Sequence, residues 1–174
     1  MASFPSSYIK TEASSVTRNA DLCSITGTNF SEWYRQEVGT VVCEADRTAI
    51  SGQYHTILRL NNGGTFRHGL RYRNALNNQM QFLANVDDAG YSVANEVLAT
   101  EVTRFGFALQ TDNSAWSAQG VVGVHGLSAT LSTVNSAYIG ASPAGTGSLN
   151  GHIRKLQYWT RRLSNTELQA LTRG

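Results

Sequence analysis

The sequence predicts an all-β fold, a sandwich of antiparallel strands that carries one short helix near its C-terminal end. Apolar and polar residues alternate over many short segments, and clusters of glycine, asparagine and serine separate these segments. A helix start signal follows the last alternating segment. Sandwiches of 174 residues commonly form a single core, so we expect one domain over residues 1–174.

Composition limits the kinds of partner. An apolar content of 41% and a charged content of 15% are typical of a globular protein rather than a disordered one. Fourteen basic and twelve acidic residues leave a net charge of +2, so we expect no nucleic-acid partner. The sequence shows neither a signal-peptide pattern nor an apolar run of transmembrane length, and we expect no membrane insertion.

The alternating segments predict the strands. The clearer ones are residues 38–44, 55–60, 66–73, 79–84, 102–110, 114–119, 137–140 and 151–159. The fainter ones are residues 8–9, 16–18, 22–25 and 91–98. Residues 61–64, Asn-Asn-Gly-Gly, predict a tight hairpin connection. In the last strand Ile153 is out of phase with Leu156, which indicates either a bulge or a strand covered on both faces.

Residues 66–73 show the alternation most clearly. Side chains of a strand point to opposite faces in turn, so this segment has one apolar face and one basic face. The two faces consist of Phe66, His68, Leu70 and Tyr72 and of Arg67, Gly69, Arg71 and Arg73.

Two helices are predicted from their start signals. Ser164 and Glu167 form a capping box, and Leu163 is placed to contact Leu168, so we expect a helix over residues 165–172. Its Leu168 and Leu171 should face the sandwich. Asn29, with Glu32 three residues later, predicts a second short helix over residues 30–35 that closes one end of the core.

Cysteine and metal chemistry are not prominent. We interpret Cys23 and Cys43 as buried thiols rather than a disulfide. Asp87 and Asp88, with Asn85, form the one compact acidic cluster, and it offers too few oxygen ligands for calcium. We therefore expect neither a metal nor a cofactor.

Two sets of segments, one at each end of the chain, carry a family pattern. The opening segments are Ser7-Tyr8-Ile9, Val16-Thr17-Arg18, Ala20-Asp21, Ile25-Thr26-Gly27-Thr28-Asn29-Phe30 and Trp33-Tyr34. The closing segments are Leu149-Asn150-Gly151-His152-Ile153, Leu156, Tyr158, Arg162-Leu163-Ser164-Asn165 and Glu167-Leu168-Gln169-Ala170-Leu171-Thr172. Together they resemble the concanavalin A-like, laminin G-like domains of bacteriophage tail and structural proteins. Lys10 and Cys23 depart from the pattern of that family. The resemblance implies a jelly-roll sandwich with a short C-terminal helix. Such folds host many functions, so function must be argued from a site.

Glycoside hydrolases of this fold carry carboxylates in the pattern E-x-D-x-x-E. Glu44 and Asp46 match its first two positions, but Ala49 stands at the third. The chain therefore lacks the acid/base partner at that place, and we expect no enzyme activity.

Sugar binding needs an aromatic surface beside polar side chains on rigid strands or loops. Three places offer this combination, and arginines suit an acidic or phosphorylated sugar because guanidinium groups bind carboxylate and phosphate bidentately. An ordinary solvated sheet face and a core position for the tryptophan are the alternatives. The candidate ligand-binding residues are Tyr54 with His55, the group Arg67, Arg71 and Arg73, and the group Asp112, Asn113 and Trp116.

The sequence thus favours a non-catalytic carbohydrate-binding module of a bacteriophage virion protein, exposed on the particle exterior, that adheres to a bacterial surface glycan. The alternative is a capsid or tail decoration protein that packs on other virion proteins without a glycan ligand. Both hypotheses predict a homo-oligomer or multicopy display, because many weak contacts together give strong attachment.

Overall fold

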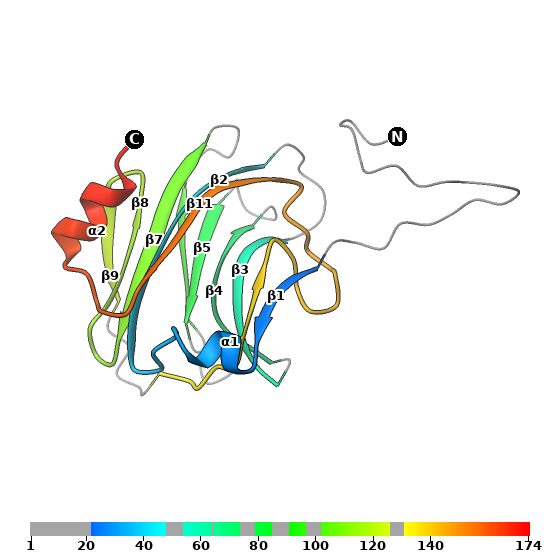
Figure 1. Ribbon diagram of the computed structural model, residues 1–174. Helices are drawn as coiled ribbons and strands as arrows, with labels where there is room; N and C mark the ends of the chain where they lie inside the picture. The colour runs from blue at the N-terminus through cyan, green and yellow to red at the C-terminus, as the bar shows by residue number, and fades with distance from the viewer. Residues whose placement is uncertain are drawn as a thin grey trace, which may run out of the picture.

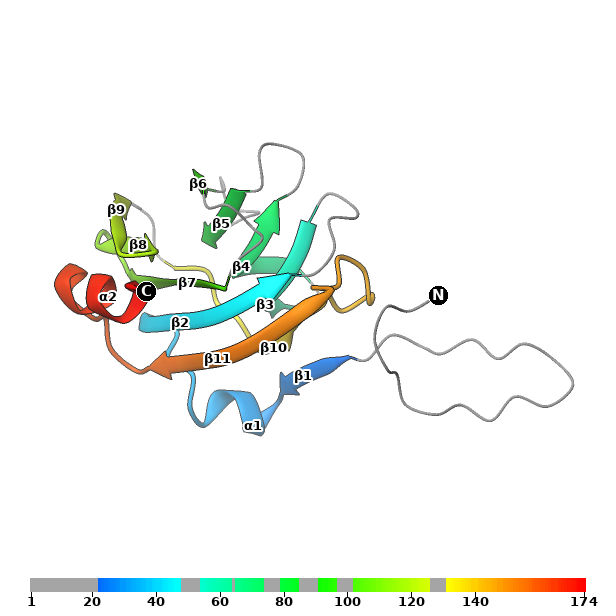
Figure 2. The same ribbon diagram turned by 90° about the horizontal axis from the view of Figure 1, so that it is seen from above.

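The chain folds into two antiparallel sheets that face each other, as the computed structural model shows for residues 22–47, 54–63, 65–73, 79–84, 91–96, 102–125 and 131–174 (Figures 1 and 2). One sheet has six strands and the other has five. A short helix lies at one end of the sandwich, and a second helix lies on the outer face of the five-stranded sheet. The predicted β-sandwich with a short C-terminal helix is confirmed.

The six-stranded sheet contains, in spatial order, β1 (Cys23–Thr26), β10 (Ser136–Ile139), β3 (Tyr54–Asn62), β4 (Thr65–Arg73), β5 (Gln79–Ala84) and β6 (Tyr91–Glu96). The five-stranded sheet contains β11 (Gly151–Trp159), β2 (Val38–Arg47), β7 (Thr103–Gln110), β8 (Ser114–Ala118) and β9 (Val121–His125). The helices are α1 (Thr28–Ser31) and α2 (Asn165–Thr172).

The clearer strand predictions are confirmed, and residues 79–84 and 151–159 match β5 and β11 to the residue. The fainter predictions at residues 22–25 and 91–98 correspond to β1 and β6. Those at residues 8–9 and 16–18 lie outside the described residues. The strand β9 was not predicted. The register shift between Ile153 and Lys155 shows that a bulge places Ile153 out of phase with Leu156 in the last strand.

The core lies between the two sheets. Phe82 of β5 stacks on Phe107 of β7 with ring centroids 4.8 Å apart. The Tyr72 hydroxyl on β4 donates a hydrogen bond of 3.0 Å to the Ala45 carbonyl oxygen on β2. Burial raises the pKa of Tyr72, so this phenol stays protonated and remains a donor. Each large apolar side chain that is buried here stabilises the folded state by about 1.5–3 kcal/mol. The Tyr72 hydrogen bond in addition links the two sheets directly.

The helix α1 closes one end of the core with aromatic side chains. Phe30 is buried, and Tyr34 stacks on Phe30 at 4.7 Å and on Tyr158 at 5.6 Å. The predicted bounds, residues 30–35 after Asn29, are wrong, because the helix spans Thr28–Ser31. It follows Gly27, whose φ of 60° reverses the chain at the end of β1.

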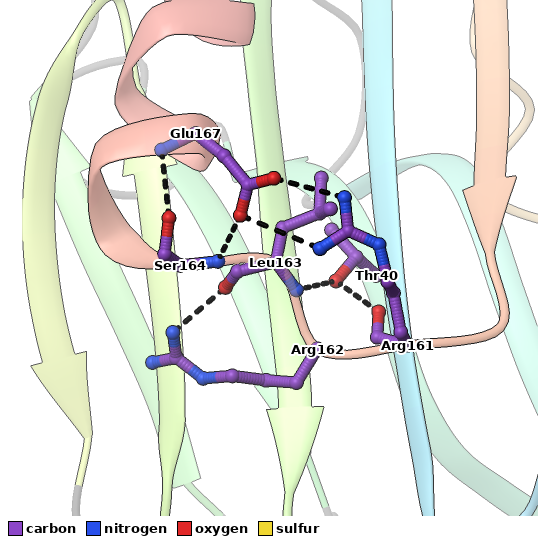
Figure 3. Close-up of polar contacts among 6 residues, drawn as sticks. All are labelled: Thr40, Arg161, Arg162, Leu163, Ser164 and Glu167. Atoms are coloured by element: carbon purple, nitrogen blue, oxygen red, sulfur yellow. Dashed lines mark hydrogen bonds and ion pairs between the residues drawn. The ribbon is translucent and has the colours of Figure 1, made fainter.

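The helix α2 begins with the predicted capping box, shown in Figure 3. The Glu167 backbone N–H donates to Ser164 Oγ at 3.2 Å, and Glu167 Oε2 accepts from the Ser164 backbone N–H at 2.7 Å. The buried Thr40 hydroxyl fixes the approach to the helix: it donates to the Arg161 carbonyl oxygen at 2.8 Å and accepts from the Leu163 N–H at 2.9 Å.

One side of α2 is buried against the five-stranded sheet. Leu168 is fully buried together with Val42, and Trp159 packs against the same cluster. The Ser117 and Thr172 hydroxyls lie 2.6 Å apart. The expectation that Leu171 also faces the sandwich is wrong, since 37% of this residue is exposed. The buried positions are therefore four residues apart.

The two cysteines differ. Cys43 is buried, as expected, and burial raises the pKa of its thiol. Cys23 is exposed, against expectation, because it begins the edge strand β1, which has a neighbour on one side only.

Candidate functional site

The outer face of the six-stranded sheet places an arginine over an aromatic ring. The guanidinium carbon of Arg71 lies 3.7 Å from the centroid of the Tyr54 ring. Arg71 Nε donates a hydrogen bond of 2.8 Å to Gln81 Oε1, and Gln81 itself is 1% exposed. The pairing of β4 with β5 puts Arg71 directly opposite Gln81. The Tyr54 ring and Gln81 Oε1 therefore both hold the Arg71 guanidinium in position.

A second arginine on this face is held in the same way. Arg59 Nε donates to Asn61 Oδ1 at 2.9 Å, and Asn61 is fully buried. This bond joins the two side chains along β3, whereas Leu58 and Leu60 belong to the core. A buried amide oxygen thus orients each of two guanidinium groups.

We call this surface the arginine face and define it by Tyr54, Arg59, Arg67, Arg71 and Gln81. Tyr54 and the three arginines are half-buried. Among the side chains that the structure describes on the arginine face, none is acidic. Gly69, which adds no side chain, lies opposite Arg59 on β3 and opposite Leu83 on β5. The face is therefore cationic, with an aromatic ring at its edge.

The alternation predicted for residues 66–73 accounts for this placement. His68, Leu70 and Tyr72 are buried, whereas Arg67 and Arg71 face outward. Arg73 pairs with Tyr54 in the backbone register of β4 and β3, and its side chain lies outside the described residues.

His55 does not lie on the arginine face. It is 1% exposed and stands opposite the buried Tyr72, so the strand turns it towards the core. Its Nδ1 lies 3.0 Å from the Ser148 carbonyl oxygen. His55 is thus a buried residue that ties β3 to the segment before β11, away from the arginine face.

The third expected group lies in the other sheet. Asp112 and Asn113 are exposed in the turn between β7 and β8, and Asp112 has a φ of 57°. The Asn113 carbonyl oxygen accepts from Arg162 Nε at 3.1 Å, which ties the turn to the start of α2. Trp116 packs against the main core, and its indole ring lies close over Gly123 of β9. Trp116 is half-buried, with one part of its ring against the core.

No protein-family model and no curated protein matches the chain. Solved structures do match. The CBM40 of the Ruminococcus gnavus IT-sialidase bound to α2,3 sialyllactose is 18% identical with a TM-score of 0.64, and the match covers 79% of this chain and 83% of that chain. The same CBM40 bound to α2,6 sialyllactose gives 18% identity and a TM-score of 0.61, covering 79% and 84%. The chain has the fold of these modules.

The Trypanosoma rangeli sialidase in complex with sialic acid also matches, at 17% identity and a TM-score of 0.62. That match covers 79% of this chain but only 23% of the sialidase. The similarity therefore concerns one domain-sized part of a larger enzyme.

The carboxylates considered for hydrolysis are both engaged in ion pairs on the outer face of the five-stranded sheet. Glu44 Oε2 accepts from Arg104 Nε at 2.9 Å, and Asp46 Oδ2 from Arg154 Nη2 at 3.1 Å. Burial alone would raise the pKa of Asp46, but hydrogen bonds from His152 and Arg154 outweigh it and lower the pKa. Such a carboxylate stays ionised and is unsuited to donate a proton.

Other chemistry is sparse in the described ranges. No group of three His, Cys, Asp or Glu side chains there is placed to hold a metal ion. Asp87, Asp88 and Asn85 lie outside the described residues. Neither helix in the described part of the chain is long and apolar enough to cross a membrane.

Arg59 and Gln81 were not predicted as site residues from the sequence. The available signal was the same alternation that identified Arg71, since Arg59 stands between Leu58 and Leu60, and Gln81 between Met80 and Phe82. A polar residue between two core residues of a strand points to the opposite face.

Proposed function

We propose that this domain is a non-catalytic module that binds an acidic glycan, and that the arginine face holds the carboxylate of the sugar. The observation that carries the proposal is the fixed position of Arg71 between the Tyr54 ring and Gln81 Oε1. A guanidinium has N–H donors in a planar fork that matches a carboxylate. An arginine that is already ordered loses little side-chain entropy on binding.

The comparisons support the acidic character of the ligand. Structures with the same fold were solved with sialyllactose or sialic acid, and sialic acid carries a carboxylate. The sequence identity of 17–18% in these matches limits them to the fold, so the proposed ligand of this chain rests on its own arginine face.

We further propose that the domain acts on the exterior of a bacteriophage particle, displayed in many copies, and adheres to a bacterial surface glycan. The resemblance of the opening and closing segments to phage tail and structural proteins supports this setting. Shallow sugar sites bind weakly one at a time, and multivalent display raises the apparent affinity without new contacts.

A structural role as a decoration protein is the second candidate. The edge strand β9 exposes Val121 by 57% and Val124 by 71%. Exposed apolar side chains on a sheet edge favour contact with another protein.

A glycan array and a pull-down on bacterial cells, both with the domain clustered on beads, test the proposal. Wild-type beads should be retained on sialylated or other acidic glycans. Arg71→Ala should reduce the affinity roughly 10- to 150-fold, the range expected for a charge-assisted hydrogen bond. Arg154→Ala is the matched control, because it removes an arginine from the opposite sheet. Folded, clustered protein that no acidic glycan retains would leave the decoration role as the better proposal.

A further inference from the structure

A pocket of about 610 Å³ lies at the end of the sandwich where α1 meets the start of β10. Figure 1 shows α1 and the stretch before β10 at the same end of the molecule. The volume falls within the range of roughly 300–1,000 Å³ that is usual for small-molecule sites. Its polar lining residues include Thr26, Ser31, Gln36, Asn135, Ser136 and Tyr138.

The lining is uncharged. No Asp, Glu, Lys or Arg is among the pocket's residues, which supply hydroxyl groups, amides and the Tyr138 ring. Hydroxyls and amides both donate and accept hydrogen bonds, and an aromatic ring contacts the apolar side of a pyranose. This chemistry suits a neutral sugar and disfavours an anion.

The walls of the pocket are fixed by hydrogen bonds. Gln36 Nε2 donates to the Val134 carbonyl oxygen at 2.6 Å, and Gln36 Oε1 accepts from the Val134 N–H at 2.9 Å. Asn135 Oδ1 accepts from the Gly63 N–H at 3.3 Å and from Ser136 Oγ at 3.2 Å. These amides are therefore structural supports of the pocket.

Two hydroxyls remain for a ligand. In the part of the chain that the structure describes, no side-chain hydrogen bond or ion pair engages the hydroxyl of Thr26 or that of Tyr138. Thr26 is exposed and Tyr138 half-buried, so a molecule in the pocket can reach both.

The pocket adjoins the arginine face. Tyr138 on β10 stands opposite Arg59 on β3, and Arg59 stands opposite Gly69 on β4. Neighbouring strands lie about 4.8 Å apart, so Tyr138 and β4 are about 10 Å apart across the sheet. A glycan whose acidic unit contacts Arg71 can extend over β3 towards the pocket.

We propose that this pocket binds a neutral sugar unit of the same glycan, so that the ligand is an oligosaccharide with an acidic unit on the arginine face and an uncharged unit between Tyr138 and Thr26. The inference rests on the proposed function and adds the class of ligand to it.

The test compares free sialic acid with α2,3 sialyllactose, titrated into the purified full chain by calorimetry or NMR. The wild type should bind the trisaccharide roughly tenfold or more tightly than the monosaccharide, as expected for two added hydrogen bonds with sugar packing. Tyr138→Phe and Thr26→Val should each lower the affinity for the trisaccharide roughly threefold to tenfold. The affinity for the monosaccharide should stay unchanged. Thr133→Val, which changes an exposed threonine outside the pocket, is the matched control.

The outcomes separate the two proposals. Equal affinity for monosaccharide and trisaccharide in the wild type, or a trisaccharide gain that survives both substitutions, would overturn the neutral subsite and leave the acidic site standing. Absence of binding to either sugar by folded protein would count against the acidic site, and the neutral subsite would fall with it. A thermal melt of each variant shows whether it folds.

Discussion

The Arg71 guanidinium carbon lies 3.7 Å from the Tyr54 ring centroid, on the same face on which Arg71 Nε donates to Gln81 Oε1. A cation held over an aromatic ring is stabilised by the ring quadrupole, and the ring also limits the rotamers of the arginine. Tyr54 is therefore a positioning residue for Arg71 in the proposed glycan site.

Tyr54→Ala should weaken binding of acidic glycans by roughly threefold to thirtyfold, because a cation–π contact contributes about 0.5–2 kcal/mol. Tyr54→Phe keeps the ring and should retain most of the affinity. Titrations of both variants with sialyllactose check this, and thermal melts should show a small effect of either change on stability. Equal losses in the two variants would assign the effect to the hydroxyl instead of the ring.

Trp116→Ala should destabilise the fold by about 3 kcal/mol, since truncating a large core side chain costs about 3–5 kcal/mol and this one is only partly buried. Glycan retention should be unchanged at temperatures where the variant is folded. Chemical denaturation and bead retention measured together check both parts. A variant with normal stability but no glycan binding would restore the turn at residues 112–116 as the binding site.

Thr40→Val should destabilise the protein by about 1–3 kcal/mol, because it leaves the Leu163 N–H and the Arg161 carbonyl oxygen without their buried partner. Thr40→Ser retains the hydroxyl and serves as the control. Urea denaturation of both variants measures the difference. If Thr40→Val proved as stable as Thr40→Ser, water must replace the hydroxyl.

Glu167 should make stability depend on pH in the acid range. Hydrogen bonds from Arg161 and from the Ser164 backbone lower the pKa of Glu167 from 4.5 to about 2. Folding therefore favours the ionised form. Its contribution is fully present above about pH 4.5 and is lost as the pH falls towards about 2.

Thermal melts of the wild type and Glu167→Gln from about pH 6 to about pH 2 test this sign. The difference between their melting temperatures should shrink as the pH falls. The lowered pKa of Asp46 affects both proteins alike, so it cancels in the comparison. A difference that stays constant over the range would contradict the capping role of the carboxylate.

The sequence predicts most elements because their patterns are local. The capping box of Ser164 and Glu167 sets the start of α2, and the alternation around Leu70 sets the faces of β4. The outward position of Arg67 and Arg71 follows from that alternation, whereas the contact of Arg71 with Tyr54 depends on the pairing of β3 with β4.

Other features depend on contacts between distant segments. Both faces of β8 are covered, with Ala115 and Ser117 under α2 and Trp116 against the core, so periodicity alone cannot show which way the tryptophan points. The strand β9 contains Gly123, whose lack of a side chain makes room for Trp116, and this interrupts the apolar pattern. The neutral pocket joins α1 to β10 across more than a hundred residues of sequence, which no local motif reveals.

The position of α2 has a practical consequence for immobilisation. The helix covers the outer surface of the five-stranded sheet, and the C-terminal residue follows it on that side (Figure 1). A bead or sensor chip attached at the C-terminal residue, Gly174, would lie next to the side of the molecule that α2 covers. The arginine face, with Tyr54 and Arg71, and the pocket at Tyr138 would then face the solution. Random coupling through lysine side chains would fix no such orientation.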